Sequence, residues 1–432
     1  MSFLRKKTTA IIGILLMLYG IVLICLKSTL LIYSVYILGA LICIVSVIDL
    51  LIHQRDLKTK LYLIGSFIIG LIMFNFPYFN LKVLILLFGL FCIGDFIAKM
   101  IIFIQYMKNK IKYRYFLLMD AVFYLFGGLI CTFKINWVVP KLSIYLGIYL
   151  ILFGFRFLRD GYEELIGGNH QFNTNRRHRM TIPVMFTALI PKGVLLGIEK
   201  AIANHEELDE IHEDVEADVE IMIHTAPSSH NMMGHVDLCF GNTVISYGNY
   251  DYTKYRLFDT IGDGVIIVAS KDRYIKFSQS YLDKTLVSFG IKFTDEQRQR
   301  VDEKLLEIFT NVEPWAPRAK RDPEHRDEYN EYSSMLYKGT GACFYKPKSG
   351  RFKSFFIFGT NCVLFADSIL GRAGTDILNV NGMITPGNYY DYFNSEFKKK
   401  NSLVVFKKVY YMKEQKRKDY LKHIGLKKHG TK

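Results

Sequence analysis

The chain has 432 residues, half of them hydrophobic, and its positive mean hydropathy is too high for an ordinary soluble protein. The formal net charge is +15, but no aromatic-interleaved basic motif accompanies it, so nucleic acid is not an expected partner. The seven cysteines show no spacing typical of a disulfide framework or a zinc site.

Six apolar runs in the first third are long enough, or nearly so, for bilayer-spanning helices, which need about 20 residues. The runs are residues 9–26, 29–53, 61–79, 81–105, 116–133 and 138–158. The first is not a cleaved signal peptide, because no small-residue cleavage pattern follows it and five more runs come after it. We therefore expect a six-helix α-helical transmembrane bundle over residues 1–160.

Lysine and arginine are concentrated at the N-terminus, in the second and fourth loops and after the sixth run. The intervening loops carry only Lys27, Lys82, Lys134 and Lys141. Because positive loops stay on the cytoplasmic side, we expect a multi-pass membrane protein with both termini cytoplasmic. Everything after about residue 160 should then face the cytoplasm.

Glycines repeat along the membrane region with a regular spacing. Gly20, Gly70 and Gly128 are each followed 19 residues later by another glycine, at 39, 89 and 147. Small residues let helices approach closely in lipid, so a structural role is favoured over a functional one. These three helical-hairpin repeats resemble the HdeD family of six-span membrane proteins over roughly residues 9–160.

Several ionisable residues lie in or near the runs, namely Asp49, Asp95, Lys99, Asp120 and Arg156. An ionisable group inside a membrane is a functional candidate by default. Most of these lie near the end of a run, however, where snorkelling or pairing across helices explains them. Asp95 and Asp120 are the two candidates for a transport or membrane-organising role.

Residues 161–214 are expected to form a juxtamembrane linker. Basic residues at 176–179 precede an apolar run at 182–191 that holds two prolines and is too short to span. This arrangement suits either the anionic inner leaflet or a buried contact with the following domain. The acidic stretch 205–214 lacks a metal-binding HExxH spacing, so we expect a solvated helical face and turn.

From residue 215 the pattern becomes that of an α+β domain with an antiparallel sheet, expected over 215–396. The expected strands are 219–224, 235–240, 243–248, 341–346 and 351–358. The turn Gly241-Asn242 predicts a hairpin of the second and third strands, and Pro347-Lys348-Ser349-Gly350 a hairpin of the last two. A capping box at Thr294-Asp295-Glu296-Gln297 predicts a helix running through Ile308.

His235 and Cys362 form the candidate catalytic pair. Cys362 follows an apolar strand and begins a helical pattern, where the helix dipole favours a thiolate. His235 begins a strand and can accept the thiol proton. The competing interpretation is a core cysteine and a structural histidine. His224 and His230 are alternative bases, although neither begins the hairpin strand in the same way.

The order of these elements, with Gly234-His235-Val236-Asp237 and Thr360-Asn361-Cys362, resembles the circularly permuted branch of the papain-like NlpC superfamily. That branch includes the lecithin:retinol acyltransferase group, and the resemblance covers residues 216–396. It implies that Cys362 is the nucleophile and that His235 acts as general base and then as acid. It also implies that the Cys362 backbone amide helps to bind the oxyanion.

The family usually orients this histidine with a polar residue from the adjacent strand. In the expected register Asp237 faces Ser246 and His235 faces Gly248, which places Ser246 diagonal to His235 on the same face. Ser246 is a weak orienter. Asp237 shares the face, and Asn249 and Asp251 follow the strand, so all three are alternatives.

Together these features predict a membrane-anchored, cytoplasm-facing thiol hydrolase or acyltransferase for amide or ester bonds, with no cofactor or metal. Inner-leaflet lipids, acylated molecules and cytoplasmic peptides are the expected substrates. The basic tail at 397–432 suits the anionic inner leaflet of the lipid bilayer or is simply solvated. The alternatives are a catalytically inactive papain-like binding module on a membrane anchor, and a membrane-organising or transport protein. Oligomeric state is not indicated.

Overall fold

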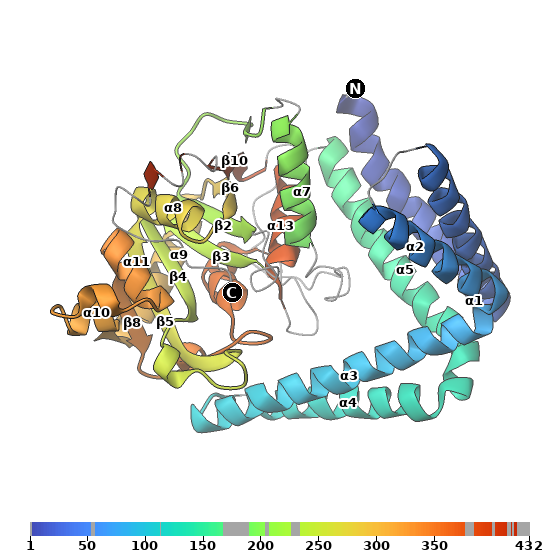
Figure 1. Cartoon of the computed structure of the whole chain (residues 1–432), viewed down its shortest axis with the longest axis horizontal. Helices are drawn as coiled ribbons and strands as arrows, with labels where there is room; N and C mark the ends of the chain where they lie inside the picture. Colours follow the sequence, from blue (N-terminus) through green and yellow to red (C-terminus); the bar gives the residue numbers. More distant parts are fainter. Residues whose placement is uncertain are drawn as a thin grey trace. The chain divides into compact units, whose positions relative to one another are not determined.

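A computed structural model describes residues 2–52, 57–112, 114–166, 190–203, 207–225, 234–375, 384–399, 402–412, 416 and 419–420. The chain divides into two compact units. The helical unit comprises Met1–Phe103 and Tyr113–Gly161, and the second unit comprises Ile104–Lys112 and Tyr162–Lys432. Figure 1 shows the helices of the first unit in blue and blue-green and the sheet of the second in green to red.

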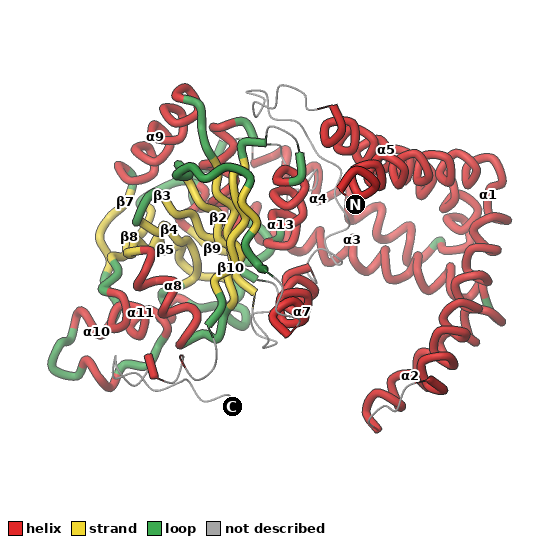
Figure 2. Tube along the Cα trace, turned by 90° about the horizontal axis from the view of Figure 1, so that it is seen from above, coloured by secondary structure: helices red, strands yellow, loops and turns green. Residues whose placement is uncertain are grey.

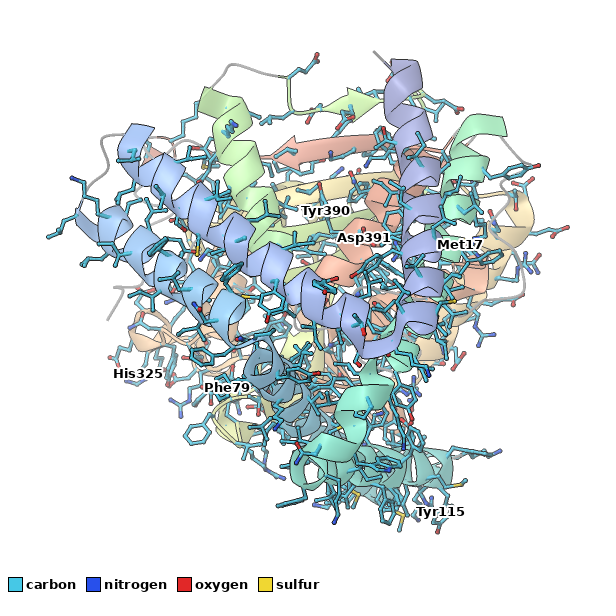
Figure 3. The ribbon with its side chains drawn as sticks, turned by 90° about the vertical axis from the view of Figure 1, so that its right-hand side faces the viewer. Met17, Phe79, Tyr115, His325, Tyr390 and Asp391 are labelled. Carbon is cyan, nitrogen blue, oxygen red and sulfur yellow. The ribbon has the colours of Figure 1, made fainter. Side chains whose placement is uncertain are left out.

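The helical unit is built from long apolar helices. They are α1 (Ser2–Ile52), α2 (Leu57–Asn75), α3 (Pro77–Lys108), α4 (Arg114–Phe133) and α5 (Ile135–Ile166). All except α2 contain a segment long and apolar enough to cross a membrane. Large apolar side chains cover their outer surfaces, as for Phe79 and Tyr115, which are labelled in Figure 3 and are both 59% exposed. This chain is an integral membrane protein.

Four described helices, rather than six, therefore satisfy the length and hydropathy of a membrane span. The difference arises at α1, which covers the first two expected runs in one helix, and at α2, which holds only a shorter apolar segment from Thr59 to Asn75. Within α1 the backbone is non-helical at Lys27, with φ of 52°. That interruption falls between the two runs.

The repeated glycines meet in pairs, where helix backbones approach each other. A Cβ atom added at Gly20 would lie 2.7 Å from the Gly147 carbonyl oxygen, and one added at Gly39 would lie 2.8 Å from that of Gly70. At Gly89 it would lie 3.1 Å from the carbonyl oxygen of Gly128. Contacts this short leave no room for a side chain, so the glycines act in helix packing.

The second unit contains an antiparallel sheet in the order β1-β10-β6-β2-β3-β4-β5-β8-β7, with β9 paired to β5. Its strands are β1 (Glu210–Ile211), β2 (Val219–Thr225), β3 (His235–Phe240), β4 (Thr243–Asn249), β5 (Ile261–Ser270), β6 (Thr285–Ile291), β7 (Val312–Trp315), β8 (Cys343–Pro347), β9 (Ser354–Phe356) and β10 (Val404–Tyr410). The α+β class with an antiparallel sheet is confirmed.

Helices cover both faces of this sheet. They are α7 (Ile190–Ala203), α8 (Lys271–Ser280), α9 (Asp295–Thr310), α10 (Arg318–Arg321), α11 (Tyr332–Thr340), α12 (Cys362–Leu370) and α13 (Pro386–Phe397). One apolar core joins the sheet to α12 and α13, for example through Phe365 and Phe393. A second core joins it to α8 and α11, through Phe277 and Leu336. Figure 2 shows α13 on one side of the sheet and α8 and α11 on the other.

The predicted β3–β4 hairpin and the predicted capping box are both confirmed. Phe240 pairs with Thr243 and Leu238 with Ile245, and Gly241 in the turn has a φ of 54°. At the start of α9 the Thr294 side chain accepts from the Gln297 amide, and the Gln297 side chain accepts from the Thr294 amide. Local sequence signals were sufficient here, because each feature closes within a few residues.

The predicted hairpin of residues 341–346 and 351–358 is wrong. β8 pairs with β5 and β7, and β9 pairs with β5 alone. β5 has ten residues, so it binds β8 along Ile266–Val268 and β9 along Ile261–Asp263. Between the two short strands, Gly350 with φ of 90° and a 3₁₀ turn redirect the chain.

The segments that flank the expected domain also differ from expectation. Glu210 and Ile211 form β1 on β10, so this part of the acidic stretch is a short strand and not a helical face. β10 itself lies beyond residue 396, within the segment expected to be a tail, and pairs with β6. Of the apolar run at 182–191, residues 182–189 lie outside the described residues, and so does His205.

Candidate active site

Three adjacent strands bring the polar residues of the candidate site together. His235 is the first residue of β3 and pairs directly with His224 on β2. Asp237 lies two residues further along β3 and therefore on the same face as His235. Gly234, with φ of 76°, precedes the strand, and a Cβ atom there would lie 2.8 Å from the His224 carbonyl oxygen. The glycine thus permits the close start of β3 against β2.

The nucleophile candidate is positioned by the start of α12. Asn361 is the N-cap residue, and its side-chain oxygen accepts from the Leu364 amide at 2.9 Å. Its side-chain nitrogen donates to the carbonyl oxygens of Ile357 and Ile384, at 2.9 and 3.1 Å. Cys362 is consequently fixed as the first helical residue, where backbone N–H groups have no partner within the helix. Its side chain is buried.

Cys362 and His235 lie near each other where α12 packs against β3. Cys362 belongs to the core on the α12 and α13 side, whereas Tyr274, which contacts Asp237, lies in the core on the α8 side. His235 is the first residue of β3, so its side chain lies at the end of the sheet, between Cys362 on one face and Asp237 on the other. Its ring lies close enough to Cys362 for the two groups to interact electrostatically, and its side chain is 18% exposed.

The Nε2 atom of the His235 ring faces three oxygen atoms. Nε2 lies 2.9 Å from Asp237 Oδ1 and 3.0 Å from Ser246 Oγ, with the Tyr250 hydroxyl at 3.3 Å. Because Nε2 is occupied by these oxygens, Nδ1 is the nitrogen left for Cys362. Ser246 and Asp237, both predicted as orienters, therefore contact the same atom of the ring.

The charges around His235 favour its protonated form. Burial lowers the pKa of its ring, but the negative charges of Cys362 and Asp237 and the hydrogen bonds with them outweigh burial and raise the pKa to about 10. The imidazolium is then the main form at neutral pH. Such a ring can donate a proton to a leaving group.

Asp237 is the anionic centre of the site and is 1% exposed. Burial alone would raise the pKa of its carboxyl, yet the charges of His235 and His224 and their hydrogen bonds hold the pKa well below its ordinary value. The Tyr274 hydroxyl also donates to Oδ2, at 2.7 Å. A carboxylate that accepts several hydrogen bonds remains ionised, so Asp237 can balance the charge of the imidazolium.

His224 and Lys284 complete the electrostatics of the site. Burial, together with the positive charges of Lys284 and His235, lowers the pKa of His224 to about 4 despite the opposing effect of Asp237. Lys284 precedes β6 at the same end of the sheet. Burial lowers the pKa of its ammonium and outweighs the opposing effects of Asp237 and Cys362. His224 is therefore neutral at pH 7.

The remaining candidates lie elsewhere. Asn249 donates to the Asp259 carbonyl oxygen, and Asp251 binds Lys346 at 2.6 Å, so neither is brought to His235. Cys239 is buried within β3, and burial first, then Glu220, raises the pKa of its thiol to about 12. His230 lies outside the described residues. Sequence reasoning did not identify Tyr274, which contacts Asp237, or Tyr250, which contacts His235. Neither α8 nor the segment after β4 carries a local sequence signal for these contacts.

A second polar cluster lies among the apolar helices. Lys99 Nζ on α3 lies 2.9 Å from Asp95 Oδ2 on the same helix and 2.5 Å from Asp120 Oδ2 on α4. The ammonium also sits over the Tyr124 ring, 3.5 Å from its centroid. Asp95 and Lys99 are each 2% exposed, whereas the Asp120 side chain is 44% exposed. The two predicted carboxylates are thus joined by one buried lysine.

Comparison with known proteins bears on the helical unit. Residues 61–133, which include most of α2 and all of α3 and α4, match the family model described as a short repeat of unknown function, DUF308. This match supports the HdeD-like resemblance of the membrane region. No curated protein and no solved structure matches the chain. Residues 61–133 of the membrane region are therefore similar to a known family.

Proposed function

We propose that the chain is a membrane-anchored thiol hydrolase or acyltransferase that cleaves amide or ester bonds through Cys362 and His235. The observation that carries the proposal is the His235 ring, which lies 2.9 Å from the buried Asp237 carboxylate and interacts electrostatically with the Cys362 thiol at the start of α12. The thiol also stands at a helix N-terminus, where the dipole stabilises negative charge. A histidine between a thiol and a carboxylate is the arrangement that nucleophilic catalysis requires.

The proposed reaction begins with attack of the Cys362 sulfur on the carbonyl carbon of the substrate. A carbon–sulfur bond forms, the carbonyl π electrons move to oxygen, and N–H groups at the start of α12 bind that oxyanion. When the tetrahedral intermediate collapses, His235 gives its Nδ1 proton to the leaving alcohol or amine. Neutral His235 then takes a proton from water or an acceptor alcohol or amine, whose oxygen or nitrogen displaces the sulfur from the thioester.

We further infer a circularly permuted papain-like arrangement for residues 215–396. Its support is the order of the elements, since the histidine strand β3 precedes the cysteine helix α12 and that helix packs against β3 and β4. The proposed thiol chemistry does not depend on this fold assignment. It depends on the three side chains and on the cap that holds Cys362.

For the membrane region we propose six spans with both termini cytoplasmic. The interruption of α1 at Lys27 supports two spans there, and the apolar segment of α2 supports a third. The excess of lysine and arginine in alternate loops supports the cytoplasmic placement. Amide or ester bonds in inner-leaflet lipids, acylated molecules or cytoplasmic peptides are then the proposed substrates.

The test is labelling of the full-length protein in native membranes by a thiol-directed acyl probe at pH 7. Cys362→Ala should abolish the label, while Cys239→Ala and Cys343→Ala should keep it. Cys239 is a buried thiol and Cys343 an exposed one, so together they control for accessibility. Equal labelling of the wild type and Cys362→Ala would overturn the proposed function.

A second candidate function is transport or membrane organisation by the helical unit, favoured by the Asp95–Lys99–Asp120 cluster. Two carboxylates and one ammonium leave an excess negative charge that can hold a proton or a cation. In proteoliposomes loaded with a pH-sensitive dye, Asp95→Asn should then abolish ion flux and Cys362→Ala should leave it intact. Absence of flux in the wild type would reject this candidate.

A further inference from the structure

Three donors converge on the single carboxylate of Asp237. Oδ1 faces His235 Nε2 at 2.9 Å. Oδ2 accepts from the Tyr274 hydroxyl at 2.7 Å and lies 2.6 Å from His224 Nε2. The donors come from β2, β3 and α8, so the orientation of the carboxylate is fixed from three sides. Only one of them, His235, touches the proposed nucleophile.

The tautomer of His224 follows from its partner. An ionised carboxylate accepts hydrogen bonds and cannot donate them, so His224 Nε2 must carry the hydrogen. In a neutral ring Nδ1 is then bare. Among the described residues neither ring nitrogen of His224 meets the full geometry of a hydrogen bond, so Nε2 has only its close approach to Asp237 and Nδ1 is unsatisfied. Leaving a buried acceptor unsatisfied costs about 1 to 3 kcal/mol. A residue whose burial is unfavourable in this way calls for an explanation other than core stability.

The groups around His224 explain why it stays neutral. Asp237 and His235 face it from β3, and the two imidazole rings meet edge to face with centroids 5.5 Å apart. Tyr274 approaches from α8, with ring centroids 6.0 Å apart, and Lys284 lies at the start of β6. Protonation of His224 would add a positive charge to those of His235 and Lys284 around the single carboxylate of Asp237. The site therefore holds two histidines on one carboxylate in opposite protonation states.

We propose that His224 is a positioning residue, which with Tyr274 holds Asp237 Oδ2 so that Oδ1 faces His235 Nε2 and Nδ1 faces Cys362. The proposal rests on the proposed function of the Cys362 site and assigns the support of its third member. A neutral donor suits this role, because it fixes the carboxylate without competing with His235 for the negative charge. The role is tested by substitutions that remove the N–H group of His224 but replace the ring with a side chain of similar volume.

The experiment measures alkylation of Cys362 by iodoacetamide between pH 5 and 11, read by mass spectrometry of the Cys362 peptide from the full-length protein. The alkaline step of the profile reports loss of the His235 proton, because the thiolate loses its charged partner there. The wild-type step is expected near pH 10. In His224→Leu it should fall by at least about one pH unit, a tenfold loss in the proton affinity of His235.

The conservative variant His224→Gln retains a neutral N–H donor and should recover most of that shift. Tyr274→Phe removes the other Oδ2 donor without loss of volume, and should move the step in the same direction even if His224→Leu does not fold. His212→Leu is the matched control, since His212 stacks on Phe397 with centroids 3.9 Å apart. Its step should equal that of the wild type.

The outcomes separate the two proposals. The positioning role is overturned if the alkaline step is unchanged in both His224→Leu and Tyr274→Phe. It is also overturned if His224→Leu and His212→Leu have equal steps. Neither result bears on whether Cys362 is the labelled nucleophile. If instead the wild-type acyl label survives in Cys362→Ala, the proposed function itself fails.

Discussion

The two units each bury a carboxylate against a cation, but the arrangements differ. In the helical unit Lys99 is shared by Asp95 and Asp120, and charges of opposite sign account for its contacts. In the sheet unit Asp237 is shared by His235, His224 and Tyr274, and only one of these is charged at neutral pH. The first arrangement sets one ammonium between two carboxylates, whereas the second places a titratable imidazole near a thiol. This difference favours the sheet unit as the place of the thiol chemistry that we propose.

The largest effect is expected for Asp237→Asn, which keeps the shape and removes the charge. His235 loses the carboxylate that stabilises its imidazolium, so acyl labelling of Cys362 should slow by about 10² to 10⁴-fold. The measurement is the labelling rate at pH 7. Asp251→Asn is the matched control, because that buried aspartate binds Lys346 and does not contact His235. Similar rates in the two variants would contradict the assigned role of Asp237.

Lys99→Met should destabilise the helical unit without changing the labelling of Cys362. Removing the lysine leaves the Asp95 carboxylate buried without its cation, and breaking one side of a buried pair costs about 3 to 5 kcal/mol. The measurement is the thermal midpoint of the full chain in detergent. Lys82→Met, at an exposed position, is the control. If Lys99→Met instead abolished labelling at unchanged stability, the two clusters would have to be coupled.

The pH dependence of stability should sharpen the same distinction. The folded pKa of His235, about 10, is above its ordinary value of 6.5, so its stabilisation is fully present below pH 6.5 and is lost as pH rises toward 10. The loss should amount to a few kcal/mol, on the order of 1.4 per unit of pKa shift. Thermal midpoints between pH 6.5 and 10 measure it. In His235→Gln that decline should be much smaller.

The smallest effect is expected at the helix cap. Asn361→Ala removes the acceptor of the Leu364 amide and should cost about 1 kcal/mol, whereas Asn361→Ser retains a capping oxygen and should cost less. Thermal midpoints of the two variants test the order. Because the cap also fixes Cys362, Asn361→Ala should slow acyl labelling more than Asn361→Ser does. The reverse order would mean that α12 does not depend on this side chain.

Features that close within a few residues were predictable from sequence. The β3–β4 register follows from a two-residue turn and a period of two, and the same register brings Ser246 and Asp237 to His235. The start of α9 follows likewise from four residues. The pairing of β5 with two separate short strands depends on its length relative to theirs, and β10 depends on the free edge of β6. Neither condition is visible in the segment itself.

The support of Asp237 was beyond sequence reasoning for a similar reason. His224 lies opposite His235 only because β2 and β3 pair with a particular register across an intervening segment. Tyr274 comes from α8, which returns to the site after two further strands. In the membrane region the apolar runs predicted where helices lie, but not that the first two would form one helix interrupted at Lys27.

The position of β10 sets the minimum length of the sheet unit. Val404, Val405 and Phe406 are buried, and β10 covers the edge of β6, which in turn pairs with the His224 strand. A fragment ending near residue 397 would expose a row of unpaired N–H and C=O groups on β6, and such an edge recruits other strands. Any attempt to produce this domain without its membrane helices must therefore extend past Tyr410, or the exposed edge of β6 will lead to aggregation.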